Sequence, residues 1–292
     1  MHRPGTARPG GMSAGLRYMV LSAFFFSLMS LLVKLVGQRL PSAEVVLGRS
    51  VVALAMSYVM VRRAGVSPWG RNRRLLTFRG LVGFAALLCF FYAIPRLPLA
   101  EVTMLQFTHP VFTALLAAMV LHERLTPAVV AGLALSMAGV ALIARPASLF
   151  GSDLAPLPAL PVALTLAGAV FSSIAYVTVR RLSATEHPYV IVFYFPLVSV
   201  PASIPIMAPH AVWPTPAEWL MLLGIGVCTQ AGQVYLTRGL QAEEAGRASS
   251  AAYVQILFAG IWGMLVFGEY PHAVSLAGAA LVVAGVLWAA RR

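Results

Sequence analysis

Ten long apolar runs, separated by short connections, constrain the fold of this 292-residue chain more than any other feature. A helix needs about 20 mainly apolar residues to cross the hydrocarbon core of a bilayer. The runs lie at residues 16–37, 42–61, 75–94, 98–121, 128–144, 160–180, 188–208, 217–237, 247–267 and 273–290. Strands of membrane barrels are only about ten residues long and alternate in polarity, so these runs predict helices. The sequence therefore predicts an all-α integral membrane protein with ten transmembrane helices.

The composition excludes a soluble or a disordered protein. Hydrophobic residues make up 60% of the chain and charged residues 10%, whereas a soluble domain has about 45–50% apolar and about 25% charged residues. The longest connections, 62–74 and 145–159, leave no room for a separate soluble domain. The first run is too long for a signal-peptide core and is interpreted as a spanning helix.

The basic residues predict the orientation in the membrane, because positive charge concentrates in cytoplasmic loops. With ten spans, the termini and alternate loops share one side. That side carries fifteen arginines, namely Arg3, Arg8, Arg17, Arg62, Arg63, Arg71, Arg73, Arg74, Arg124, Arg180, Arg181, Arg238, Arg247, Arg291 and Arg292. The other side has four basic residues, Arg39, Arg96, Arg145 and Lys34. Both termini are therefore predicted to be cytoplasmic, and the net charge of +12 is interpreted as a topology signal that contacts anionic lipids, not as a nucleic-acid surface.

Several cofactor classes are not expected. Lys34 is the only lysine and is followed by Leu35, so the chain contains no phosphate-binding P-loop and no ATP site. Cys89 and Cys228 both lie in apolar runs and form no zinc or disulfide pattern. We expect neither a metal nor another cofactor.

The two halves of the chain resemble each other at a constant offset of 146 residues. Matches include Glu123 with Glu269 and Gly139 with Gly285. We therefore divide the chain into a first repeat, 1–146, and a second repeat, 147–292, each with five spans. Because five is odd, the second repeat is predicted to be inverted in the membrane, as in many secondary transporters, whose substrate sites lie between the repeats.

Two pairs of segments carry a family resemblance. PVFTALLAAMVLHE (110–123) is followed by AGLALSMAGVAL (131–142), and LFAGIWGMLVFGE (257–269) by LAGAALVVAGVL (276–287). These segments resemble the EamA-type repeats of the drug/metabolite transporter superfamily, and LGRSVVAL (47–54) is similar to its arginine-containing helix. Within the superfamily the chain looks most like bacterial amino-acid and metabolite exporters of the YddG kind. One departure is that Pro110 corresponds to Ile256 in the second repeat.

Polar residues at helical spacing within the spans mark a candidate binding cavity, since such groups usually face the interior of a bundle. The candidates are Gln106, His109, Ser173, Tyr176, Gln230, Gln233, Tyr253, Gln255 and Trp262. The alternative is that they form only hydrogen bonds between helices. Because no Asp or Glu lies deep in a predicted span, His109 is the candidate for proton coupling.

Another set of residues is assigned a structural or gating role: Arg49, Pro110, Glu123 and Glu269. The glutamates are expected to fix helix ends, and Pro110 to interrupt its helix. Lys34 and Arg79 are expected to extend towards the membrane edge. Small residues at Gly132, Gly139, Gly278 and Gly285 predict close packing of the fifth and tenth spans, away from the cavity.

These features favour a non-enzymatic secondary transporter that exports small metabolites across a bacterial inner membrane by alternating access. The favoured substrates are amino acids, including aromatic amino acids. The alternatives are a channel or a protein that moves lipids or drugs. An intramembrane enzyme is disfavoured, because the sequence shows no nucleophile–base pair or metal-ligand spacing within a span.

Overall fold

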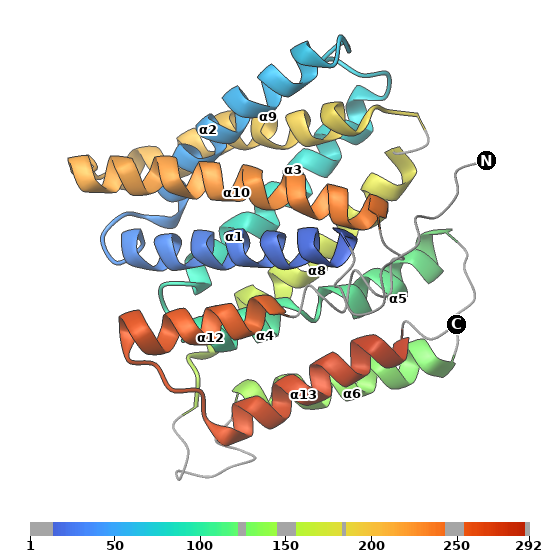
Figure 1. Ribbon diagram of the computed structural model, residues 1–292, viewed down its shortest axis with the longest axis vertical. Helices are drawn as coiled ribbons and strands as arrows, with labels where there is room; N and C mark the ends of the chain where they lie inside the picture. The colour runs from blue at the N-terminus through green and yellow to red at the C-terminus, as the bar shows by residue number, and fades with distance from the viewer. Residues whose placement is uncertain (1–13, 122–126, 145–155, 183–184, 243–253, 290–292) are drawn as a thin grey trace.

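The computed structural model describes residues 14–121, 127–144, 156–182, 185–242 and 254–289, and these residues contain helices and no strand. The helices of the first half are α1 (Ala14–Val36), α2 (Ser42–Arg63), α3 (Arg73–Ala93), α4 (Leu99–Gln106), α5 (His109–Leu121) and α6 (Pro127–Ala144). Those of the second half are α8 (Ala159–Leu182), α9 (Pro188–Met207), the short η1 (Ala208–His210), α10 (Pro216–Ala242), α12 (Val254–Phe267) and α13 (Ala273–Ala289) (Figure 1). Six of them, α1, α2, α3, α8, α9 and α10, are long and apolar enough to cross a membrane. The all-helical membrane fold is confirmed.

The predicted span at 98–121 differs from the structure because it is two helices. α4 ends at Gln106 and α5 begins at His109, so Phe107 and Thr108 interrupt the span. The residue at 110 is a proline and has no amide hydrogen to donate to the carbonyl of Gln106, as a continuous helix would require. The hydroxyl of Thr108 instead donates to the carbonyl of Leu105 at 2.8 Å. In the predicted span at 247–267, the structure describes only the part from Val254 onwards.

The helices pack in a pattern that is preserved when the two halves are exchanged. α1 packs on α10 and α3 on α8, and each pair becomes the other after a shift of 146 residues. The pairs α2–α9 and α6–α13 join helices that correspond to each other. In Figure 1, α1 runs from right to left and its counterpart α8 from left to right. This antiparallel arrangement is that of inverted repeats related by a pseudo-two-fold axis.

α6 and α13 form a separate pair at one edge of the bundle (Figure 1). A Cβ atom added to Gly278 would lie 2.6 Å from the carbonyl oxygen of Gly139, and one added to Gly285 would lie 2.6 Å from that of Gly132. These two contacts are equivalent under the repeat, because Gly139 corresponds to Gly285 and Gly132 to Gly278. The predicted close packing of the two helices on small residues is confirmed.

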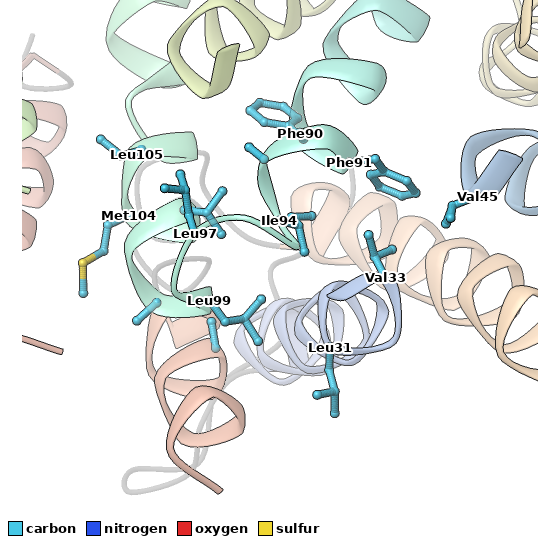
Figure 2. Close-up of a cluster of buried hydrophobic side chains, with 14 of the residues drawn as sticks. Leu31, Val33, Val45, Phe90, Phe91, Ile94, Leu97, Leu99, Met104 and Leu105 are labelled. Atoms are coloured by element: carbon cyan, nitrogen blue, oxygen red, sulfur yellow. The ribbon is translucent and has the colours of Figure 1, made fainter. Parts of the chain in front are cut away.

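A large apolar cluster fills one end of the bundle, near the segments 37–41 and 94–98. Figure 2 shows Leu31, Val33, Val45, Phe90, Phe91, Ile94, Leu97, Leu99, Met104 and Leu105 of this cluster, contributed by α1 to α4 and the α3–α4 connection. All of them are buried. Since segments 37–41 and 94–98 belong to the side that is poor in arginine, this cluster lies towards the side predicted to be external.

Candidate substrate cavity

Two adjoining hollows lie between the halves of the protein, with volumes of about 320 and about 450 Å³. The smaller is lined by Gln106, His109 and Gln255, and we call it the amide hollow. The larger is lined by Arg79, Thr229 and Gln230, and we call it the arginine hollow. Eight residues line both: Arg49, Gly83, Ala86, Ser172, Tyr176, Phe195, Gln233 and Leu236. We treat the two hollows as one cavity, whose size falls in the range of about 300–1,000 Å³ usual for small-molecule sites.

The repeat offset of 146 residues relates many of the lining residues to one another. The pairs are Phe26 and Ser172, Met29 and Ala175, Arg49 and Phe195, Gly83 and Thr229, Leu87 and Gln233, Phe90 and Leu236, and His109 and Gln255. Corresponding residues can face one space only if that space lies on the pseudo-two-fold axis. The cavity therefore lies where the two repeats meet.

Arg49 of α2 is buried in the wall of this cavity, with only 6% of its surface exposed. Its Nε donates to the hydroxyl of Thr229 at 3.0 Å, whereas its buried Nη1 has no hydrogen-bond partner within the described ranges. The guanidinium lies over the rings of Phe195, at 5.3 Å, and Phe91, at 5.8 Å. The aromatic faces attract the cation, but they leave a guanidinium N–H without an acceptor.

Arg79 of α3 lines the arginine hollow and lies 5.0 Å from the same Phe195 ring. Its Nε and Nη1 are buried and have no hydrogen-bond partner among the described residues. The expectation that Arg79 reaches the membrane edge is wrong, because the side chain turns into the bundle. The expectation of a purely structural role for Arg49 also missed its place in the cavity wall. None of the described residues that line the cavity is an aspartate or a glutamate.

Glutamines supply neutral hydrogen-bonding groups around the two arginines. Gln230 is 3% exposed, and its amide nitrogen lies 3.0 Å from the sulfur of Met60. Thioether sulfur is a weak acceptor, so this amide retains capacity for a ligand. Gln233 follows on the same face of α10 and lines both hollows, while Gln106 and Gln255 line the amide hollow from α4 and α12.

His109 and Tyr176 stack on each other in the wall of the amide hollow. Their rings stack at 5.2 Å with an angle of 2° between the planes, and none of the described residues gives the buried Nδ1 of His109 a hydrogen-bond partner. Ser173 does not line the cavity, because its hydroxyl lies 2.8 Å from the backbone oxygen of His109. Its neighbour Ser172 occupies the lining instead.

Of the three other predicted residues, only Trp262 is described by the structure, and it lies outside the cavity lining. The indole nitrogen of Trp262 donates to the hydroxyl of Ser27 at 3.1 Å, and this tryptophan packs between α12 and α1 outside the cavity lining. Tyr253 and Glu123 lie outside the described residues.

The sequence interpretation also missed lining residues, namely Arg79, Ser172, Phe195 and Thr229. One sequence signal could have placed Arg79 in the lining. Gly83 and Ala86 follow it by four and seven residues, so the three share one helical face, and the two small residues leave space beside that face. A Cβ atom on Gly83 would lie 2.9 Å from the ring of Phe195, so this glycine admits the ring that packs against both arginines.

Glu269 joins helix ends from both halves of the chain. One of its carboxylate oxygens pairs with the ammonium of Lys34, and the other accepts from the amide of Leu99 at 2.9 Å. Lys34 also donates to the carbonyl of Leu97 at 2.6 Å and is 3% exposed, so the expectation that it extends to the membrane edge is wrong. The pair joins the end of α1 in the first half to the end of α12 in the second.

A polar cavity between two helical repeats is the arrangement found in many secondary transporters. The chain belongs to the EamA-like transporter family, whose model matches residues 13–145 and 159–291.

Named relatives are also transporters. The chain is 37% identical over 273 residues to the pseudopaline exporter CntI of Pseudomonas aeruginosa, covering 93% of this chain and 94% of the relative. It is 30% identical over 290 residues to human solute carrier family 35 member G1, covering 95% of this chain and 79% of the relative. A solved structure shares the fold, with a TM-score of 0.65 at 23% identity, covering 95% of this chain and 96% of the other. The finer resemblance to amino-acid exporters of the YddG kind is not supported, since the bacterial exporter at 37% identity is named for pseudopaline.

Proposed function

We propose that this protein is an exporter of small amino-acid-type metabolites that binds its cargo in the cavity between the repeats and moves it out of the cytoplasm by alternating access. The observation that carries the proposal is the position of the cavity on the pseudo-two-fold axis, with buried amides and guanidinium groups in its wall. A site on this axis keeps equivalent surroundings when the two repeats exchange conformations. The relatives that are named as exporters support the same direction of transport.

The proposed location is the inner membrane of a bacterium, with both termini in the cytoplasm and anionic lipids around the arginine-rich loops. The apolar cluster and the Lys34–Glu269 pair then form the closed external gate. Glu123 and Arg180 are the counterparts of Glu269 and Lys34 in the repeat. We assign Glu123 the same role in closing the cytoplasmic side.

Two glutamines in the cavity wall, Gln230 and Gln233, provide the test of this function. Gln230→Ala and Gln233→Ala remove hydrogen-bonding groups from the cavity without adding charge. In proteoliposomes, we expect saturable uptake of a labelled amino acid or related metabolite by the wild type and at least a tenfold loss of kcat/KM in the double variant. Each lost hydrogen bond to a ligand is worth about 0.5–1.5 kcal/mol, and two together approach or exceed the 1.4 kcal/mol that corresponds to a tenfold change.

A matched control is Gln38→Ala, because Gln38 is an exposed glutamine at the end of α1, outside the cavity. It should transport like the wild type. Flux that does not saturate would indicate a channel, and flux that is unaffected by the double variant would contradict the cavity as the binding site.

His109→Gln tests proton coupling in the same assay. We assign any stimulation of transport by an imposed proton gradient to this histidine, so the variant should lose that stimulation.

A further inference from the structure

Arg49 and Arg79 line the cavity with buried N–H donors and have no negative partner among the residues that the structure describes, and this imbalance indicates the chemical class of the cargo. Arg49 and Arg79 both lie against Phe195, so their guanidinium carbons are no farther apart than the sum of 5.3 and 5.0 Å. Buried charges are normally paired, because an unpaired ion in a medium of low polarity costs several kcal/mol. No described lining residue supplies a carboxylate.

The unpaired atoms point to the geometry of the missing partner. Three buried donors, Arg49 Nη1, Arg79 Nε and Arg79 Nη1, have no acceptor in the described part of the chain. Guanidinium groups present their N–H donors in a planar fork that matches a carboxylate. Donors on two separate guanidinium groups can therefore hold two carboxylates, or one carboxylate shared between them.

Charge balance decides between these arrangements. A neutral amino acid has a net charge of zero and would leave the two arginines uncompensated, while also bringing its ammonium group close to them. A solute with two carboxylates and no ammonium would neutralise both. Resting on the proposed function, we infer that the cargo is a small organic solute with at least two carboxylates and a net negative charge, held by Arg49 and Arg79.

The distribution of polar groups gives this cargo an orientation. The arginines both come from the first repeat, and their counterparts in the second are Phe195 and Ile225. The remaining polar wall, formed by Gln106, His109 and Gln255 in the amide hollow, carries no fixed charge. The carboxylates therefore bind in the arginine hollow, and the rest of the molecule extends into the amide hollow.

The experiment compares acids with amides of the same shape. Binding of glutarate and glutaramide, and of glutamate and glutamine, is measured on the purified full-length protein in nanodiscs through the rise in unfolding temperature with ligand concentration. Ionic strength is held constant, because exposed charges are screened by salt. We expect the acid of each pair to bind at least tenfold more tightly than the amide, with glutarate showing the larger preference.

The variants Arg49→Gln and Arg79→Gln should each reduce this preference at least tenfold, and Arg79→Lys should restore part of it. Arg63→Gln is the matched control, since Arg63 is exposed at the end of α2 and should leave the preference unchanged. If Arg49→Gln fails to fold, the two Arg79 variants still decide the question. Equal binding of acids and amides would overturn the inference, as would an acid preference that survives in Arg79→Gln. Stabilisation by sulfate as strong as that by glutarate would also overturn it, by showing a general anion site.

Transport measurements separate this inference from the proposed function. If the amides are transported as well as the acids, the function stands and the anionic cargo is wrong. If the acids bind through the arginines but no solute in the panel crosses the membrane, the anion site stands and the proposed export of these metabolites is wrong.

Discussion

At the scale of single residues, three cationic side chains that point into the bundle are stabilised in two different ways. Lys34 has a carboxylate and a backbone carbonyl from its own chain. Arg49 and Arg79 both lie near the ring of Phe195, and each has buried donors without a partner among the described residues. The first arrangement is complete without a ligand and suits a gate, whereas the second is completed only by a ligand and suits a binding site.

The gate pair can be tested against an exposed ion pair of the same protein. Glu269→Gln leaves the ammonium of Lys34 buried without its carboxylate, and we expect it to reduce the free energy of unfolding by about 3 kcal/mol, at the lower end of the range for buried pairs. The control is Glu218→Gln, which breaks the solvent-exposed pair with Arg39. Thermal unfolding in detergent should show a clear decrease for the first variant and little change for the second. Equal losses of stability in the two variants would show that the burial of Lys34 does not increase the contribution of its ion pair to stability.

At the scale of helices, two glycines differ in the space that a larger side chain would find beside them. Gly278 of α13 lies so close to α6 that an added Cβ would be 2.6 Å from the carbonyl oxygen of Gly139, whereas at Gly260 of α12 the nearest atom would be 4.0 Å away. A backbone oxygen cannot rotate away as a side chain can, so the first contact forces the helices apart.

We therefore expect Gly278→Ala to destabilise the protein by about 2 kcal/mol, as overpacking commonly does. Gly260→Ala should be neutral, or stabilising by up to about 1 kcal/mol through its better helix propensity. The unfolding temperatures of the two variants give the comparison directly. A Gly278→Ala protein as stable as Gly260→Ala would contradict the close approach of α6 and α13.

At the scale of the whole molecule, the distribution of arginines and the direction of the helices together assign the two sides of the membrane. The described arginines that are predicted to be cytoplasmic lie near the start of α1, the start of α3 and the ends of α2, α8 and α10. These helix ends lie towards one side of the bundle in Figure 1.

Cysteine labelling tests this assignment. In a Cys89→Ala/Cys228→Ala background, Ser67→Cys lies in the arginine-rich connection after α2, and Ala211→Cys lies between η1 and α10; both positions are exposed. A membrane-impermeant maleimide added to intact cells should label Ala211→Cys and should label Ser67→Cys only after the membrane is disrupted. The reverse pattern would place the termini outside and make the Lys34–Glu269 pair a cytoplasmic gate.

The sequence by itself determined the helical membrane fold, the approximate bounds of the spans and the internal repeat. These properties depend on local composition and on comparison of the chain with itself: run length indicates a span, and the constant offset that joins Gly139 to Gly285 indicates duplication. It also identified Gln230, Gln233, His109 and Tyr176 as polar groups within spans, which the structure brings to one cavity.

Only the tertiary structure decided which side chains face that cavity. Helical spacing makes Ser172 and Ser173 almost equally good candidates for the cavity lining. In the structure Ser172 lines the cavity, whereas the hydroxyl of Ser173 donates to the backbone oxygen of His109. Arg79 lies near a helix end, where an arginine usually extends to the interface. It turns inward because Gly83 makes room for Phe195, a residue more than a hundred positions later, and the ring of Phe195 attracts its guanidinium. Contacts between residues so distant in sequence depend on how the two repeats pack together, and no local pattern encodes that packing.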